Sequence, residues 1–134
     1  MRSADSEAPL TLGTFCSGTD APVFALRQGG IPHRHVFSAE TDKNARRFIQ
    51  ANSPPEVMYD DIMALDLDTI PRVDLFVAGP PCQPFSRMNR INSVRLDLPS
   101  YTFDPRVAIL RRCLEYIQVK QPKLAIMENV IALG

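Results

Sequence analysis

Short apolar runs alternate with longer amphipathic stretches along most of the chain. Five runs of three to six residues are rich in branched or aromatic side chains and are bounded by turn-forming residues, which is typical of β-strands. One of them, Val73–Ala78, is apolar and branched apart from Asp74, as expected for a strand buried on both faces. The five predicted strands are Leu10–Phe15, His35–Ala39, Val57–Tyr59, Val73–Ala78 and Leu124–Met127.

Three helices are predicted between these strands. The first starts at Ala21 with Asp20 as its cap and stops at Gly29-Gly30, the second covers Asp42–Gln50, and the third runs from Asp104 to Pro122. Apolar residues spaced three or four apart predict which faces are buried. These predicted inward residues are Ala45, Phe48 and Ile49 in the second helix, and Val107, Leu110, Leu114 and Ile117 in the third.

The resulting order is β-α-β-α-β-β-α-β. Strands separated by helices pair in parallel through right-handed crossovers, so the fold class is α/β with a mostly parallel sheet. Loops at the carboxyl ends of such strands are where open α/β sheets bind ligands. The alternation therefore predicts a nucleotide-binding type of sheet.

Length and composition narrow the class of protein. The chain has 134 residues, enough for one domain or a piece of one. Residues 1–9 are predicted to be a disordered lead-in and 10–134 to form the domain. We expect no membrane span and no secretion signal, because no apolar run is long enough. The three cysteines form no CxxC pair, so neither a disulfide framework nor a metal site is predicted.

Candidate chemical groups follow the predicted strands one after another. Ser17-Gly18 forms a turn after the first strand, and Glu40 ends the second, 22 positions after Gly18. An acid at that spacing is where a ribose hydroxyl pair is bound in dinucleotide-type folds. Asp61 follows the third strand and could accept a hydrogen bond from an adenine amino group. Glu40 could equally be an exposed charge, and Asp61 ordinary turn chemistry.

The loop after the fourth strand carries a cysteine. It reads Gly79-Pro80-Pro81-Cys82-Gln83-Pro84-Phe85-Ser86, and its prolines make it stiff. A thiol held at that edge of the sheet is placed for chemistry, although most free cysteines are small core residues. The Cys82 thiol is therefore a candidate nucleophile or a core residue on this evidence alone.

Charge is distributed unevenly although the net charge is zero. Six arginines stand against two aspartates between Ser86 and Arg112. Such a basic segment could lie against phosphates, and a solvated helix face with a charged loop is an equal alternative. Residues 87–100 have no clean period and are predicted to form a long loop.

Taken together, these strand-end groups resemble the amino-terminal half of the catalytic domain of the cytosine-5 DNA methyltransferases. The PPCQPFS stretch and the Glu128-Asn129-Val130 stretch, 46 positions apart counted from Cys82 to Glu128, carry the resemblance. It covers Leu10 to Gly134 and implies a Rossmann-like sheet of the S-adenosylmethionine-dependent type. The implied cofactor is S-adenosylmethionine, and the implied partner is double-stranded DNA.

The resemblance also implies a role for individual residues. Cys82 would attack carbon 6 of the target cytosine, Glu128 would bind the N3 edge of the ring, and Pro81 and Asn129 would shape the two loops. Residues of the following loop would contact the nucleic acid. The implied cofactor-binding residues are Phe15, Ser17, Gly18, Glu40, Asp61 and Ile62, and the implied substrate-binding residues are Gln83, Ser86 and Arg87.

Elementary chemistry agrees with these roles. Cytosine is a poor substrate for direct methylation at carbon 5, and covalent activation by a thiolate divides one difficult step into two easier ones. An acid at the opposite edge of the ring is then required. Neither group reaches a base inside a duplex, so the base must be flipped out, and the loop at residues 87–100 would close over it.

The chain also departs from the family pattern. The family's Phe-x-Gly-x-Gly motif has its aromatic one place early here, at Phe15, and its second glycine is Asp20, which would add negative charge near the methionine end of the cofactor. The family's basic second-half motif and target-recognition region are missing. We therefore expect a sheet incomplete at its carboxyl-terminal side, with an unpaired apolar edge, that needs the missing half or a partner chain.

Three other functions stay open. PPCQPF followed by an arginine also suits the related transfer-RNA cytosine methyltransferases, which makes RNA the alternative partner. A truncated, non-catalytic module that binds cofactor or a partner is the second, and an unrelated nucleotide-binding domain is the third. The expected localisation is the nucleus if the source is eukaryotic and the cytoplasm if it is bacterial.

Overall fold

The computed structural model describes residues 8–81 and 105–128. Five strands form one fully parallel sheet in the order β3-β2-β1-β4-β5. They are β1 (Leu10–Phe15), β2 (His33–Ala39), β3 (Val57–Tyr59), β4 (Leu75–Ala78) and β5 (Leu124–Met127). The α/β class and the parallel pairing predicted from the sequence are confirmed. The second strand begins two residues earlier than expected, and the fourth two residues later.

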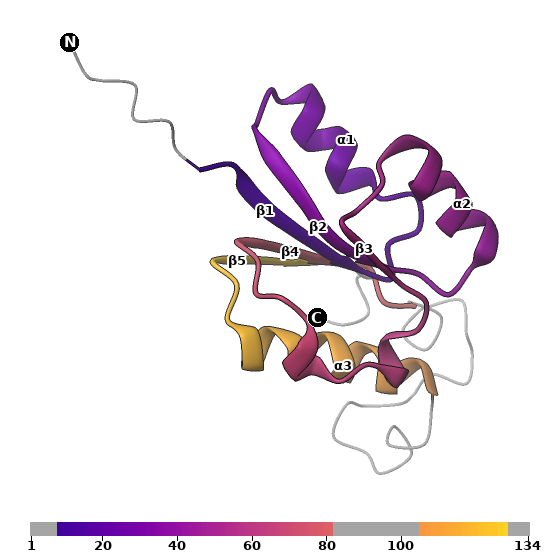
Figure 1. The fold of residues 1–134 in the computed structure, drawn as a ribbon. Coiled ribbons are helices and arrows are strands. Elements are labelled where there is room, and N and C mark those ends of the chain that lie inside the picture. Colours follow the sequence, from indigo (N-terminus) through magenta and orange to yellow (C-terminus); the bar gives the residue numbers. More distant parts are fainter. Residues whose placement is uncertain (1–7, 82–104, 129–134) are drawn as a thin grey trace.

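Helices cover both faces of the sheet. Helices α1 (Ala21–Gln28) and α2 (Lys43–Asn52) lie on one face, and α3 (Pro105–Lys120) lies on the other (Figure 1). Two short 3₁₀ helices, Ile62–Ala64 and Leu67–Thr69, lie between β3 and β4 and were not predicted. Each begins at an aspartate whose side chain accepts a hydrogen bond from the first turn, which explains the local winding.

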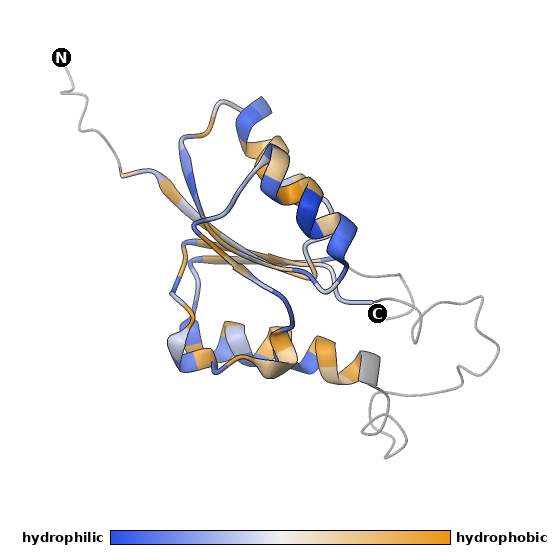
Figure 2. Cartoon of the chain, turned by 45° about the vertical axis from the view of Figure 1, so that its right-hand side comes forward, coloured by the Kyte–Doolittle hydropathy of each residue, from blue (hydrophilic) through white to orange (hydrophobic). Residues whose placement is uncertain are grey.

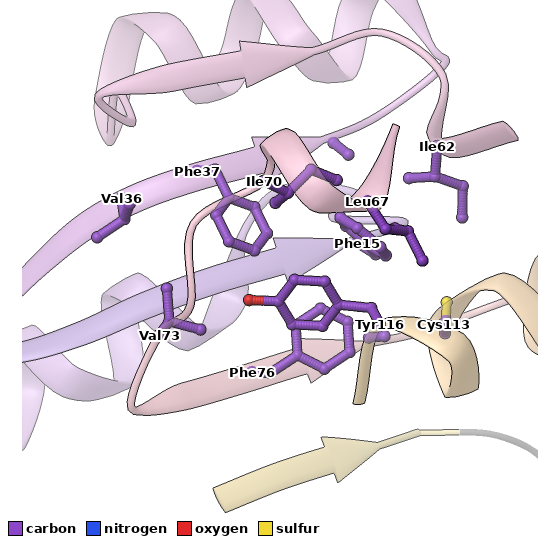
Figure 3. Close-up of a cluster of buried hydrophobic side chains, with 12 residues drawn as sticks. Phe15, Val36, Phe37, Ile62, Leu67, Ile70, Val73, Phe76, Cys113 and Tyr116 are labelled. Atoms are coloured by element: carbon purple, nitrogen blue, oxygen red, sulfur yellow. The ribbon is translucent and has the colours of Figure 1, made fainter. Parts of the chain in front are cut away.

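An aromatic cluster fills the layer between the sheet and α3. Phe15, Phe37, Phe76 and Tyr116 are fully buried, and their ring centroids lie 4.4 to 5.7 Å apart (Figure 3). The Tyr116 hydroxyl donates to the Pro71 carbonyl oxygen at 2.7 Å, which satisfies the only polar atom of that side chain. The packing of these rings therefore sets the distance between α3 and the sheet.

Gly13 makes room for one of these rings. A Cβ atom at this position would lie 2.2 Å from Cζ of Phe37, and the pairing of β1 with β2 shifts register between Leu12 and Gly13. Glycine lets the Phe37 ring lie directly on the backbone of the neighbouring strand.

The predicted faces of two helices need correction. In α3 Val107 is buried and Ile117 packs against the core, as predicted. The fully buried residues of this helix are Cys113 and Tyr116, which were not predicted, whereas Leu114 is 50% exposed. Burial follows the residues that meet the aromatic cluster, and the spacing of apolar residues alone allowed another face. In α2 Phe48 is 43% exposed and pairs with Phe24 of α1, so only Ile49 of that helix is fully buried. Figure 2 shows that hydrophilic and hydrophobic residues alternate along the helices.

At the amino ends of the central strands, Asp74 joins β1 to β5. Its carboxylate accepts hydrogen bonds from the amide and hydroxyl groups of Thr11 and lies 2.9 Å from the Lys123 ammonium. Lys123, and then Thr11, hold the pKa of Asp74 well below its usual range. These contacts stabilise the sheet at the amino ends of its strands, opposite the candidate site.

Strand β5 lies at one edge of the described sheet and pairs only with β4. Its residues Leu124 and Ile126 point away from α3 and are 56% and 47% exposed. The apolar edge expected from the sequence is therefore present in the described residues. The expectation that a missing half completes the fold stays a prediction.

Candidate active site

Loops at the carboxyl ends of the strands surround two adjoining cavities, of about 240 and about 610 Å³. Cys16, Gly18 and Gly79 line both. The smaller cavity collects residues that follow four strands, and the larger extends along the sheet beside α1. Residues that the sequence placed at the ends of separate strands therefore lie around one site.

Four of the implied cofactor residues meet in the smaller cavity, together with Pro81. This is the juxtaposition that the parallel sheet was expected to produce. The five predicted residues that line the smaller cavity are Gly18, Glu40, Asp61, Ile62 and Pro81.

The turn after β1 is built from residues with positive φ. Cys16, Gly18 and Asp20 have φ values of 51°, 56° and 57°, so the backbone alternates in and out of the left-handed region. A Cβ at Gly18 would meet nothing within 4 Å, so the space above the turn is open. Glycine adopts a positive φ without strain, so it is the favoured residue at position 18.

Glu40 is tied to this turn. Its Oε2 accepts from the Gly18 amide at 2.7 Å and its Oε1 from the Asp42 amide at 3.0 Å. Arg46 of α2 donates to the carbonyl oxygens of Glu40 and Thr41, at 2.6 and 2.8 Å. The carboxylate is thus held at the cavity wall while its remaining lone pairs can accept from hydroxyl groups.

Asp61 and Ile62 form the opposite side of the smaller cavity. Oδ1 of Asp61 accepts from the Met63 amide at 2.9 Å, which caps the first 3₁₀ helix. Ile62 is 5% exposed and packs on the aromatic cluster, and its carbonyl oxygen accepts from Nε of Arg112 at 3.1 Å. Arg112 also donates to the Leu65 carbonyl oxygen, so α3 fixes this segment.

The ends of β4 and β5 lie next to each other. The Glu128 amide donates to the Ala78 carbonyl oxygen at 2.9 Å. A Cβ at Gly79 would lie 3.6 Å from Oε2 of Glu128, so the carboxylate lies over that glycine. Pro81 follows two residues later, on the wall of the smaller cavity. The Glu128 carboxylate therefore lies at the start of the loop that leads to residue 82.

Two implied cofactor residues contribute in a different way from the others. The Phe15 ring is fully buried in the aromatic cluster, although Phe15 also lines the larger cavity. The Ser17 hydroxyl points into a buried set of polar groups and donates to the Ala39 carbonyl oxygen at 3.1 Å. Both residues therefore support the turn from its buried side.

Several sequence predictions fall outside the described residues. These are the roles of Cys82, Gln83, Ser86, Arg87 and Asn129, the loop at 87–100 and the cap at Asp104. The roles assigned to them stay predictions. Most of the predicted lead-in, residues 1–7, is also outside the described part of the chain.

Asp20 does not cap α1. Its side chain makes no capping hydrogen bond, and it is fully buried between Thr14 and His35. His35 lies in β2, and its side chain is 7% exposed. Nothing in the sequence indicates that Asp20 and His35 pair, because they lie far apart along the chain.

A pair of thiols next to the site was also missed. Cys16 packs against the core that contains Cys113, and a hydrogen bond from Cys113 lowers the pKa of the Cys16 thiol. The same contact, with burial, raises the pKa of the Cys113 thiol. Nothing in the spacing of the two cysteines along the chain indicates this contact.

Iodoacetamide is therefore expected to alkylate Cys16 well before Cys113, because the thiolate is the reactive form and Cys113 is buried. Peptide mapping by mass spectrometry after short exposures, in a series from pH 6 to 9, would measure both rates and separate them from Cys82. Equal rates at the two cysteines in the folded protein would contradict the assignment.

Within residues 8–81 and 105–128, no group of three or more His, Cys, Asp or Glu side chains is arranged to hold a metal ion. None of the helices in the same ranges combines the length and the hydropathy needed to cross a bilayer.

Known proteins resemble this chain in sequence over most of its length. The DNA (cytosine-5-)-methyltransferase DMT5 of Cryptococcus neoformans is 28% identical over 142 residues, which cover 90% of this chain and 6% of that protein. The type II methyltransferase M.NgoBI of Neisseria gonorrhoeae is 36% identical over 96 residues, which cover 72% of this chain and 27% of that protein. The chain thus spans a small part of these relatives.

A solved structure has the same fold. The crystal structure of the S. pombe Dnmt2 methyltransferase superposes with a TM-score of 0.67 at 22% identity, covering 91% of this chain and 36% of that one. The Rossmann-like methyltransferase fold expected from the sequence is confirmed. The family model for C-5 cytosine-specific DNA methylase matches residues 11–134, which is nearly the whole sequence. This chain belongs to the C-5 cytosine-specific DNA methylase family.

Proposed function

We propose that the protein transfers a methyl group from S-adenosylmethionine to carbon 5 of a cytosine flipped out of double-stranded DNA. The observation that carries the proposal is the single cavity lined by Gly18, Glu40, Asp61, Ile62 and Pro81. It adjoins the start of the loop that leads to Cys82, with the Glu128 carboxylate over Gly79. Membership of the family and the names of the relatives support the reaction class.

The residues present fit this cofactor. Glu40 offers carboxylate lone pairs to a ribose hydroxyl pair, and Asp61 offers an acceptor for an adenine amino group. Ile62 supplies an apolar wall, and the left-handed Gly18 leaves the space above the turn free of a side chain. S-adenosylmethionine supplies an electrophilic methyl group when it is bound.

The chain's own groups would activate the base. The Cys82 thiolate forms a bond to carbon 6 of cytosine, which moves electron density to carbon 5 and makes that carbon nucleophilic. Glu128 binds the N3 edge and stabilises the charge that develops on the ring. After carbon 5 has gained the methyl group, water acting as a base takes the carbon 5 proton. The electron pair of that bond re-forms the 5,6 double bond and expels the Cys82 thiolate from carbon 6, which restores the aromatic ring. Arg87 and the adjacent basic residues would contact phosphates.

Covalent trapping tests the proposal. With S-adenosylmethionine, a duplex that carries 5-fluorocytosine should form a denaturation-resistant adduct with the protein, because fluorine blocks the final proton loss. The adduct should map to Cys82 and disappear in Cys82→Ser, whereas Cys113→Ala, which alters a buried core thiol, should retain it.

Substrate class is decided by the same experiment. Transfer RNA with 5-fluorocytosine is the competing substrate, because the PPCQPF stretch followed by an arginine is also compatible with that branch. An adduct with RNA and none with DNA would replace the proposed substrate by RNA. No adduct with either, in a folded protein that binds the cofactor, would contradict catalysis and favour a binding module.

A further inference from the structure

A buried polar chain connects β1, β2 and the cofactor turn below the candidate site. Thr14, Asp20 and Ser38 are each no more than 1% exposed, and the His35 side chain is 7% exposed. Consecutive members lie 2.7 Å apart from Ser38 to Ser17, Ser17 to Thr14 and Thr14 to Asp20. Polar groups this deeply buried are costly unless each one is paired.

The direction of these hydrogen bonds follows from the number of protons. A carboxylate only accepts, so the single Thr14 hydroxyl proton goes to Oδ1 of Asp20. The one Ser17 hydroxyl proton then lies between two acceptors, Oγ1 of Thr14 at 2.7 Å and the Ala39 carbonyl oxygen at 3.1 Å, and the shorter contact is with Thr14. The Ser38 hydroxyl donates to Ser17. Oδ1 of Asp20, as the acceptor at the end of the chain, therefore orients the hydroxyls of Thr14, Ser17 and Ser38.

His35 lies at the Asp20 end of this polar chain. Its Nδ1 lies 2.8 Å from the Ser53 carbonyl oxygen, which can only accept, so Nδ1 carries a proton. Its Nε2 lies 3.3 Å from Oδ2 of Asp20, and within the described residues neither atom has another polar partner. Two lone pairs facing each other in a buried site would repel. A proton between the two atoms relieves this repulsion, and when Nε2 carries it the contact is an ion pair.

We infer that Asp20 and His35 form a buried ion pair that positions the Ser17-Gly18 turn for the cofactor. Asp20 replaces the second glycine of the family pattern, and its φ of 57° is the conformation that glycine would adopt there. Aspartate is among the few residues that tolerate this conformation. Its carboxylate points into the protein, so the charge expected near the methionine end of the cofactor is paired with His35 and accepts a hydrogen bond from Thr14. Asp20 and His35 are positioning residues.

Three substitutions separate positioning from simple packing. Asp20→Gly keeps the backbone conformation and removes the carboxylate, so affinity for S-adenosylmethionine should fall on the order of 10-fold or more. Asp20→Asn should bind within about threefold of wild type, because the amide can still accept from Thr14 and can donate to a neutral His35. Thr14→Val leaves the ion pair intact and disconnects it from Ser17, so it should also weaken binding on the order of 10-fold.

Isothermal titration calorimetry on folded variants measures these affinities, and melting temperatures are recorded alongside. Glu56→Gln is the control, because it removes a carboxylate from the exposed ion pair with Arg34 (2.8 Å) and should leave affinity unchanged. Nitrogen-15 spectra of the ligand-free protein should show both ring nitrogens of His35 protonated in wild type and only one in Asp20→Asn.

The inference rests on the proposed function in assuming that this cavity binds S-adenosylmethionine. No binding by wild type would overturn the proposed function, and the His35 spectrum would still test the ion pair. Wild-type affinity in Asp20→Gly or Thr14→Val, equal loss in Asp20→Gly and Asp20→Asn, or a singly protonated His35 in wild type would each overturn the inference.

Discussion

Glu128→Gln should lower the rate of methyl transfer by about 10²- to 10⁴-fold, the usual contribution of an acid–base group. Glutamine keeps the shape of the side chain over Gly79 but cannot supply a proton to the ring edge. Single-turnover assays with radiolabelled S-adenosylmethionine would measure the chemical step directly. Cofactor affinity should stay near the wild-type value, because the cavity that holds Glu40 and Asp61 does not include Glu128.

The control for this result is Glu115→Gln, in which an acid on α3 that pairs with Arg112 (3.0 Å) is neutralised in the same way. It should transfer methyl groups at close to the wild-type rate. A Glu128→Gln enzyme with wild-type single-turnover kinetics would contradict the proposed role of the carboxyl group.

Phe76→Ala is expected to lower the free energy of unfolding by about 3–5 kcal/mol. Phe76 is fully buried on β4, and its ring centroid lies 4.4 Å from that of Tyr116 and 5.2 Å from that of Phe15. Truncation therefore leaves a cavity where β1, β4 and α3 meet. Urea denaturation followed by circular dichroism would give the difference between the variant and wild type.

Phe24→Ala makes the same chemical change at a ring that is 38% exposed on α1. It should cost less than about 1 kcal/mol, because water already reaches this ring. Equal losses in the two variants would show that the aromatic cluster does not hold α3 on the sheet.

The order of the strands along the chain, the parallel class and the groups at the strand ends could all be predicted from residue patterns. These properties are local, because a short branched run bounded by Gly or Pro indicates a strand wherever it lies. Parallel pairing then brings the carboxyl ends to one edge, so Gly18, Glu40 and Asp61 could be assigned to one site before any distance was known.

The tertiary structure alone decided which faces are buried and which polar groups pair. Leu114 fits the apolar spacing of its helix as well as Tyr116 does, and only the position of Phe15, Phe37 and Phe76 selects Tyr116 for the core. Burial depends on what lies opposite a residue, and spacing along one helix does not contain that information.

The same reason applies to the polar interior. Asp20 and His35 are 15 positions apart on different elements, and the sequence presented one as a helix cap and the other as a strand residue. Their contact exists because parallel strands bring β2 beside the turn after β1, and because the left-handed backbone at Asp20 turns its carboxylate inward. Cys16 and Cys113 meet for the same kind of reason, because α3 packs across the end of the turn.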